Sequence, residues 1–428
     1  MLPQRVVKVE QTARLEVNEP LVSDNRPLGR VVVMGAGLAG LMAADALRAA
    51  GIEVAVFEAR DRVGGRVLSV PFAGNVVERG AEFILPQNTA VESLAARFEL
   101  PLVRKGTPYG RREPRGGEAV PKAELEAVFD RIATGEPATA TGTVAEAIDA
   151  LGLEPRLAAL IRARLEVSMG HPADDLRSEV LGEGAATFGD FDSFTVKGGN
   201  AELARALAGE LGGAIHLSSP VRRVRWGDRR VTVATDAGEL DADAAVIAVP
   251  TAPLKEIDFE PPLRGPTADS LAAVRYGQNA KLFVALRAPA PPSAIMSVRR
   301  RFWSYTQLDS HGEPAPFVTA YAGTRGAVDA LTDSREARWI EELAALRPEL
   351  ELNPEAALLS TWHDDPWVRG SYSARSVSSP LRDRELATPI GPLYFAGEHT
   401  AGDWHGLMEG ALRSGERAAR QLLGVSGT

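Results

Sequence analysis

The sequence predicts an α/β protein of two domains, in which a Rossmann-like domain is interrupted twice by a second domain. Three observations predict this class: a glycine-rich strand–turn–helix–strand unit near the start, short strands after residue 195, and a final strand and long helix. The stretches between them are helical first and strand-rich later, which predicts a unit with a mixed sheet and a helical insertion. We expect the Rossmann-like domain to comprise 30–87, 195–256 and 388–428, and the second domain 88–194 and 257–387.

The first element is the strand–turn–helix–strand unit at residues 30–58. Residues 31–34 (VVVM) form an apolar run that is too short for a helix and rich in β-branched side chains, so we expect a buried strand. A helix rich in Ala and Leu is expected at 38–50, and a second strand at 53–57.

Three glycines, Gly35, Gly37 and Gly40, separate this strand and helix in the spacing G-x-G-x-x-G. Gly35 permits the tight turn, Gly37 lets a pyrophosphate approach the helix N-terminus, and Gly40 lets helix and strand pack closely. Glu58 follows the first glycine by 58 − 35 = 23 residues, where an acidic side chain meets adenosine ribose hydroxyls. Strand, helix and acid agree, so we expect a bound dinucleotide rather than an empty glycine-rich turn.

The remaining elements follow from apolar periodicity and turn residues. A hairpin is expected at 67–77 around Gly74, and a helix at 88–100 with Asn88 as its cap and Leu94 facing inward. Further helices are expected at 122–132, 143–167 with a break near Gly152, 201–211, 334–346 and 406–423. Further strands are expected at 214–217, 221–226, 231–235, 243–249, 281–286, 302–308, 317–322, 358–362 and 393–398.

Composition excludes several classes of function. The net charge of −9 over 428 residues does not suit nucleic acid or an anionic membrane. The absence of cysteine excludes disulfides, thiolate metal sites, a cysteine nucleophile and a cysteinyl cofactor link, and the histidines show no metal spacing. Residues 1–29 lack a signal-peptide pattern and are expected to form an N-terminal arm or tail. No apolar run of membrane-spanning length occurs, so we expect a cytoplasmic protein.

Two further motifs carry polar groups to strand ends. In EARDRVGGR, which starts at Glu58, the pair Gly64 and Gly65 lies beside arginines whose forks suit phosphate oxygens. In YFAGEHTAGDWHGLMEG, Glu398 stands at a strand end where a carboxylate can accept ribityl hydroxyls. The helix that starts near Leu407 would direct its positive end at an electron-rich ring edge. The simpler alternatives are a basic surface turn and an ordinary terminal helix.

These motifs together resemble the FAD-containing amine oxidase family, which includes monoamine oxidases, polyamine oxidases and L-amino acid oxidases. The resemblance extends through GAEF at 80–83, VKGGNAELARALA at 196–208, VIAVPTAP at 246–253, NAKLFVAL at 279–286 and WHDDPWVRGSYS at 362–373. It implies an FAD-binding domain built from separated segments and a substrate-binding domain built from the two excursions. The residues expected to bind FAD are Gly35, Gly37, Leu38, Ala39, Gly40, Glu58, Ala59, Arg60, Gly64, Gly65, Arg66, Gly80, Ala81, Glu82, Phe83, Val221, Trp362, Gly397, Glu398, Gly406, Leu407, Met408 and Ala411.

The resemblance also implies which residues take part in catalysis. Lys281 matches a lysine that holds a water against flavin N5; the alternative is a strand-end lysine that extends outward into solvent. Trp362 matches a tryptophan beside the isoalloxazine, and Tyr372 matches one wall of an aromatic cage. Glu82 is a candidate acid or base, with a structural hydrogen bond as the alternative.

Three departures from the family pattern bear on cofactor attachment and substrate. Ser371 stands where some monoamine oxidases carry a flavin-linking cysteine, so FAD should be held non-covalently. Leu407 replaces the second aromatic wall of the cage, which argues against a small primary amine. Phe83 stands where L-amino acid oxidases often have a carboxylate-binding arginine, which argues against a free amino acid.

We therefore expect an FAD-dependent oxidase that removes a hydride from a carbon next to nitrogen. A larger secondary amine, an amide or an amino-acid-derived biosynthetic intermediate is the expected substrate, and dioxygen the electron acceptor, because no second G-x-G-x-x-G follows a strand. Three alternatives stay open: an L-amino acid oxidase, a C–C desaturase of the protoporphyrinogen oxidase or carotene desaturase type, and a non-redox flavin scaffold or mutase. A homodimer is one possible assembly.

Overall fold

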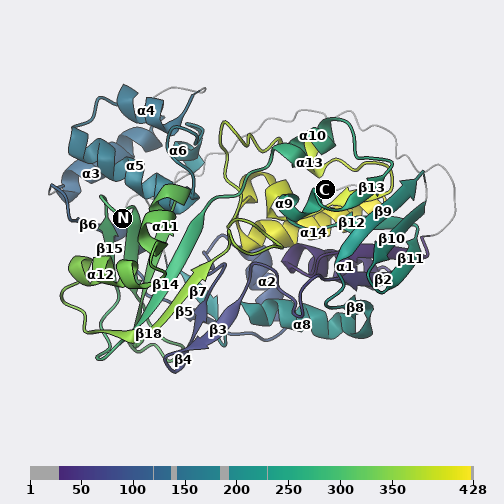
Figure 1. The fold of residues 1–428 in the computed structure, drawn as a ribbon, viewed down its shortest axis with the longest axis horizontal. Helices are drawn as coiled ribbons and strands as arrows, with labels where there is room; N and C mark the ends of the chain where they lie inside the picture. The colour runs from purple at the N-terminus through teal and green to yellow at the C-terminus, as the bar shows by residue number, and fades with distance from the viewer. Residues whose placement is uncertain (1–27, 119, 136–141, 184–191, 229, 426–428) are drawn as a thin grey trace.

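A parallel sheet in the order β19-β12-β1-β2-β8 forms the centre of one lobe of this computed structural model. Its strands are β1 (Arg30–Met34), β2 (Glu53–Phe57), β8 (Ile215–His216), β12 (Ala244–Ile247) and β19 (Leu393–Phe395). Figure 1 shows by colour that they come from widely separated parts of the chain. The structure describes residues 28–118, 120–135, 142–183, 192–228 and 230–425, so the predicted N-terminal arm lies outside the described residues apart from its last two.

Both faces of this sheet are buried. Successive side chains of β1 point to opposite faces, and all four from Val31 to Met34 are buried. Val31 and Val33 pack in one apolar cluster with helices α1 (Leu38–Ala49), α2 (Thr89–Arg97), α8 (Ala201–Leu211) and α14 (Met408–Leu422). Val32 and Met34 pack instead against a four-stranded sheet. Its strands are β9 (Val221–Gly227), β10 (Arg230–Thr235), β11 (Gly238–Ala242) and β13 (Asp258–Glu260). The result is a three-layered lobe.

The other lobe is built on a mixed sheet in the order β18-β14-β17-β16-β15-β6. Its strands are β6 (Glu113–Arg115), β14 (Asn279–Leu286), β15 (Ser293–Ser297), β16 (Phe302–Thr306), β17 (Phe317–Gly323) and β18 (Leu352–Thr361). Helices α11 (Arg325–Thr332) and α12 (Ala337–Leu346) cover one face, where Leu282 and Val284 of β14 are buried. Lys281 and Phe283 point to the opposite face.

A group of helices lies beside this second sheet and corresponds to the predicted helical insertion (Figure 1). It comprises α3 (Lys122–Ala133), α4 (Val144–Ala150), α5 (Pro155–Met169) and the short α6 (Val180–Glu183). The helix predicted at 143–167 is therefore two helices, with the break where Gly152 predicted it. The smaller elements are β3 (Ser69–Phe72), β4 (Asn75–Glu78), β5 (Leu102–Arg104), β7 (Phe194–Val196), α9 (Thr251–Leu254), α10 (Pro266–Ala273) and α13 (Asp383–Ala387).

The α/β class and most predicted elements are confirmed, including the β3–β4 hairpin around Gly74. Asn88 is the N-cap residue of α2 as predicted, but its side chain forms no capping bond, because Oδ1 accepts the Leu85 N–H at 2.8 Å instead. The free N–H groups of α2 are met by Glu409 of α14, which accepts from Ala90 and Val91 at 3.0 Å. Among the described residues, no helix has the length and apolar character needed to cross a lipid bilayer.

Candidate active site

A cavity of about 470 Å³ is lined by residues from both lobes. Every residue predicted to bind FAD or to take part in catalysis lines it, with the exception of Gly40. Residues that the sequence did not single out also line it, among them Tyr109, Ser168, Trp303, Tyr305 and Tyr321. The cavity therefore has one end among the glycines of the Rossmann-like lobe and another among aromatic side chains.

The glycine turn after β1 is a cradle that side chains would fill. Gly35 has φ +100°, and a Cβ there would lie 2.8 Å from the Ala248 carbonyl oxygen. A Cβ on Gly40 would lie 1.9 Å from the Gly35 oxygen, so Gly40 is needed for packing and does not reach the cavity. Next to Gly37 there is open space, as an approaching phosphate requires.

Glu58 lies at the end of β2 with its carboxylate close to this turn. Its Oε2 accepts the Ala36 N–H at 2.8 Å and its Oε1 accepts the Arg60 N–H at 2.9 Å. Burial raises its pKa, and these backbone donors oppose that shift. The Arg60 guanidinium forms a two-pronged ion pair with Asp365, with both contacts at 2.7 Å. Both prongs of this guanidinium therefore bind a carboxylate. The sequence had led us to expect that they would bind phosphate oxygens.

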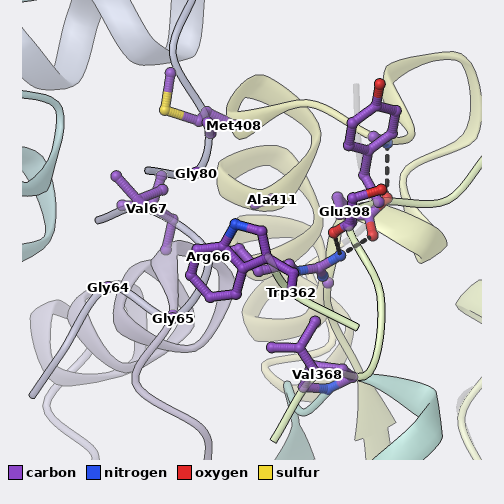
Figure 2. A pocket seen from close by; sticks show the side chains of 18 of the residues that line it. Gly64, Gly65, Arg66, Val67, Gly80, Trp362, Val368, Glu398, Met408 and Ala411 are labelled. Atoms are coloured by element: carbon purple, nitrogen blue, oxygen red, sulfur yellow. Dashed lines mark hydrogen bonds and ion pairs between the residues drawn. The ribbon is translucent and has the colours of Figure 1, made fainter. Parts of the chain in front are cut away.

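Arg66 and Glu398 join the two sequence-distant halves of the glycine-lined end. Arg66 Nη1 lies 2.7 Å from Glu398 Oε1, and the guanidinium carbon lies 4.8 Å from the centre of the Tyr276 ring. Burial would raise the pKa of Glu398, but Arg66 and further donors lower it to about 2. Figure 2 shows the pair in the same pocket as Trp362. Tyr276 in turn lies 3.2 Å from Nδ1 of His399, whose pKa burial lowers to about 4.

Lys281 is buried and ion-paired, so the outward-pointing alternative is wrong. Its Nζ donates to the Glu78 and Gly80 carbonyl oxygens at 2.8 Å and to Glu82 Oε2 at 2.5 Å. A second lysine, Lys105, contacts Glu82 Oε1 at 2.9 Å and was missed by sequence reasoning. It lies in a segment without regular periodicity, and nothing local indicates its partner.

Glu82 is held as a carboxylate by these lysines and by Tyr305, whose hydroxyl donates to Oε2 at 2.7 Å. Burial would raise the pKa of Glu82, but Lys105, Lys281 and Tyr305 lower it to about 2. A carboxyl group with this pKa stays ionised near neutral pH, which favours the structural alternative over an acid or base.

Trp362 and Ser371 are fixed by hydrogen bonds to the chain around them. The Trp362 indole donates from Nε1 to the Arg79 carbonyl oxygen at 3.0 Å, and its ring packs on Gly80. Ser371 Oγ lies 2.8 Å from the Gly277 carbonyl oxygen and 2.6 Å from Asn279 Oδ1.

The other end of the cavity is lined by aromatic side chains. Tyr372 donates to the Ser168 carbonyl oxygen and lies 2.8 Å, hydroxyl to hydroxyl, from Tyr321. Trp303 is paired with Tyr321 across neighbouring strands, and Tyr321 with Lys281, so the three share one face of the sheet. Alternation along β16 and β17 is the signal that could have identified these side chains.

Three comparisons relate this chain to known proteins. The model of the family described as flavin containing amine oxidoreductase matches residues 38–423. The chain is 29% identical to a Mycobacterium tuberculosis protein named flavin-containing monoamine oxidase AofH, over 92% of this chain and 96% of that protein. It is 28% identical to putrescine oxidase of Kocuria rosea, over 94% and 98%. A structure of wild-type putrescine oxidase with bound putrescine shares the fold, with a TM-score of 0.79 at 24% identity, over 93% of this chain and 100% of that one. The chain therefore belongs to the flavin-containing amine oxidoreductase family.

Proposed function

We propose that this protein is an FAD-dependent oxidase that acts on the bond between carbon and nitrogen. The observation that carries the proposal is the single cavity that joins the glycine cradle to an aromatic chamber, with Lys281 and Trp362 among its lining residues. Such a cavity can hold a flavin and a substrate in contact. We further propose that 30–87, 195–256 and 388–428 form the FAD-binding domain, and 88–194 and 257–387 the substrate-binding domain.

The residues at the glycine-lined end fit FAD. The open space at Gly37 suits the pyrophosphate, Glu58 suits the adenosine ribose, and Glu398 suits the ribityl chain. We propose non-covalent binding, because the chain has no cysteine and the Ser371 hydroxyl lies within hydrogen-bond distance of two oxygen atoms, one of which can accept its proton. When bound, FAD would supply hydride acceptance at N5 and electron transfer to dioxygen, which gives an imine or iminium product and hydrogen peroxide.

The chain's own contribution is orientation and exclusion of water from the reacting nitrogen. Tyr321 fixes the hydroxyl of Tyr372, so that this aromatic wall has one position. Glu82 accepts a hydrogen bond from Lys281 and so fixes the position of its Nζ. All three ammonium hydrogens of Lys281 have protein acceptors, so a water held by Lys281 would have to replace one of them.

We propose a larger secondary amine, an amide or an amino-acid-derived intermediate as the substrate. The cavity supports this, because the side chain at Leu407 is aliphatic, whereas Trp303 and Tyr305 of β16 and Tyr321 of β17 line the cavity wall. We also propose that dioxygen is the electron acceptor and that the protein is cytoplasmic. A homodimer is the assembly that we propose.

Anaerobic mixing of the flavin-loaded protein with a panel of amines, amides and amino acids tests this proposal. Bleaching of the flavin spectrum by a secondary amine or amide, followed by peroxide formation on aeration, is the expected result. Fast peroxide release with small aliphatic amines would overturn the substrate class. Bleaching by tetrapyrroles or polyenes but by no nitrogen compound would favour a desaturase. If no compound bleached the flavin, a scaffold or mutase would be indicated.

A further inference from the structure

Lys105 is a second buried lysine beside Glu82, and the proposed reaction does not use it. Its side chain is 2% exposed, and its Nζ lies 2.9 Å from Glu82 Oε1. The backbone of Lys105 is fixed on both sides, because its N–H donates to the Ser193 carbonyl oxygen at 2.8 Å and its carbonyl oxygen accepts the Leu308 N–H at 2.7 Å. Lys105 lies behind the residues that line the cavity, so it can act on a bound molecule only through Glu82 or through its charge.

The group formed by Glu82, Lys105 and Lys281 carries one net positive charge, because it contains two ammonium groups and one carboxylate. Lys281 Nζ lies 2.5 Å from Glu82 Oε2, and the Tyr305 hydroxyl donates to the same oxygen at 2.7 Å. Burial would raise the pKa of Glu82, but the two lysines and Tyr305 lower it to about 2. The carboxyl group is therefore ionised near neutral pH, and it neutralises only one of the two lysines.

Glu78 is a further buried carboxyl group that interacts with Lys105 and Glu82. Its carboxylate accepts the Asn200 N–H at 2.7 Å and the Ser69 hydroxyl at 2.8 Å, and burial raises its pKa. Both of these partners are uncharged and neither depends on Lys105. A substitution that removes the Lys105 ammonium group therefore changes the local charge by one unit.

The charged group lies where the two ends of the cavity meet. Glu82 lines the cavity together with its neighbours Gly80 and Phe83. Gly80 packs against the Trp362 ring, whereas the Phe83 ring centre lies 5.8 Å from that of Tyr305 at the aromatic end. A flavin whose nucleotide occupies the glycine-lined end has to place its ring at this junction to meet a substrate in the aromatic end. In a buried site a unit charge acts over several ångströms without contact.

We propose that Lys105 sets the reduction potential of the bound flavin. Reduction adds two electrons and one proton to the flavin, so the ring gains one negative charge, which a nearby positive charge stabilises. Lys105 is a positioning residue in this role, because it acts across Glu82 from behind the cavity wall. It fixes Oε1 of the carboxylate, and it supplies the positive charge that Lys281 alone, neutralised by Glu82, would not provide. This inference rests on the proposed function for the presence of a flavin.

Equilibrium reduction of the flavin-loaded protein, without any amine, tests this proposal. Dithionite supplies the electrons under anaerobic conditions, and a reference dye of known potential gives the ratio of reduced to oxidised flavin. At a fixed dye potential, Lys105→Met should lower this ratio at least about fivefold, because one positive charge is lost. Lys105→Arg keeps the charge and should stay close to wild type. Lys197→Met removes an exposed lysine elsewhere and should leave the ratio unchanged.

The double variant Lys105→Met with Glu82→Gln separates the effect of charge from structural damage. It removes one charge of each sign, so its net charge equals that of wild type and the ratio should recover at least to the wild-type value. A purely structural role predicts the opposite, because the double variant loses more contacts than the single one. An unchanged ratio in Lys105→Met, or a double variant with a ratio as low as that of the single one, would overturn the proposal.

If Lys105→Met fails to fold, Lys105→Gln takes its place, since an amide can donate to Glu82 but carries no charge. The same decrease in the ratio is expected, and a ratio equal to that of wild type would overturn the proposal. No amine takes part in these measurements. A charge-dependent ratio in a protein whose flavin no amine reduces would therefore refute the proposed oxidation and leave this role of Lys105 in place.

Discussion

Replacing Glu82 with Gln should destabilise the protein strongly, because both Lys105 and Lys281 contact this carboxylate. The Nζ atoms lie 2.9 and 2.5 Å from its two oxygens, and the lysine side chains are 2% and 8% exposed. The pKa of Glu82 falls from 4.5 to about 2, because the lysines and Tyr305 outweigh burial. That difference of 2.5 pH units corresponds to about 3 kcal/mol. Leaving two buried ammonium groups without their carboxylate is expected to cost about 3–5 kcal/mol.

Urea unfolding of the flavin-saturated wild type and Glu82→Gln measures this loss. The folded-state pKa is depressed, so the stabilisation is fully present above pH 4.5 and is lost as the pH falls toward 2. The gap in unfolding free energy should be about 3 kcal/mol at neutral pH and should narrow below pH 4.5. Glu355→Gln, at an exposed position, should change stability by less than about 0.5 kcal/mol.

A gap below about 1 kcal/mol at neutral pH would refute the reasoning, because the carboxylate would then contribute no more than a surface pair. The double variant Glu82→Gln with Lys281→Met provides a second check. It should lose less stability than the sum of the two single changes, since each single change leaves a buried partner unmet. Additive losses would show that the two groups do not interact.

Three further predictions concern the cradle, the histidine behind it and the aromatic wall. Gly40→Ala should disrupt folding, because its Cβ would lie 1.9 Å from the Gly35 oxygen, and a normally folded variant would contradict this. Gly37→Ala should unfold at the same temperature as wild type without flavin but should bind flavin more weakly. Circular dichroism measures the folding of both variants, and flavin fluorescence measures the binding. Burial lowers the pKa of His399 from 6.5 to about 4, so between these pH values the unfolded state binds a proton that the folded state excludes. The unfolding free energy of wild type should therefore fall by up to about 3 kcal/mol as the pH falls from 6.5 to 4. In urea unfolding, His399→Asn should show a weaker dependence of this free energy on pH, and an equal dependence would contradict the prediction. Tyr321→Phe should raise KM more than it lowers kcat and cost about 1 kcal/mol of stability, because the Tyr372 hydroxyl loses a partner at 2.8 Å; a dominant effect on kcat would mean that Tyr321 acts in the chemistry.

The glycine-lined end could be predicted from the sequence because its geometry is local. The turn at Gly35 and Gly37 follows from backbone conformation within a few residues, and Glu58 follows at a fixed distance along the same unit. Gly40 fits the same logic, since its role is close packing and not contact with the cavity. Glu398 is sequence-distant, and only its place in a second motif connected it with Arg66.

The aromatic end could not be predicted, because it depends on strand register and on contacts between distant segments. Trp303 faces the cavity because β16 pairs with β17 in the register that places Trp303 opposite Tyr321. A shift of this register by one residue would turn Trp303 to the other face of the sheet. Lys105 and Arg112 lie in a segment of short strands and turns without apolar periodicity. Their partners come from elsewhere in the chain, so only the folded structure brings Lys105 to Glu82 and Arg112 to Ser168.

Glu58 and Glu398 line the same cavity, and their distance along the chain has a consequence for biosynthesis. The two carboxylates are 398 − 58 = 340 residues apart, so at about 5–20 residues per second a ribosome needs roughly 20 to 70 s between them. During that interval α1 lacks its neighbour α14. In the folded protein, Leu412 and Ala418 of α14 pack in one apolar cluster with the buried side chains of α1. Nascent chains should therefore expose this surface to chaperones, and flavin capture should be a post-translational event.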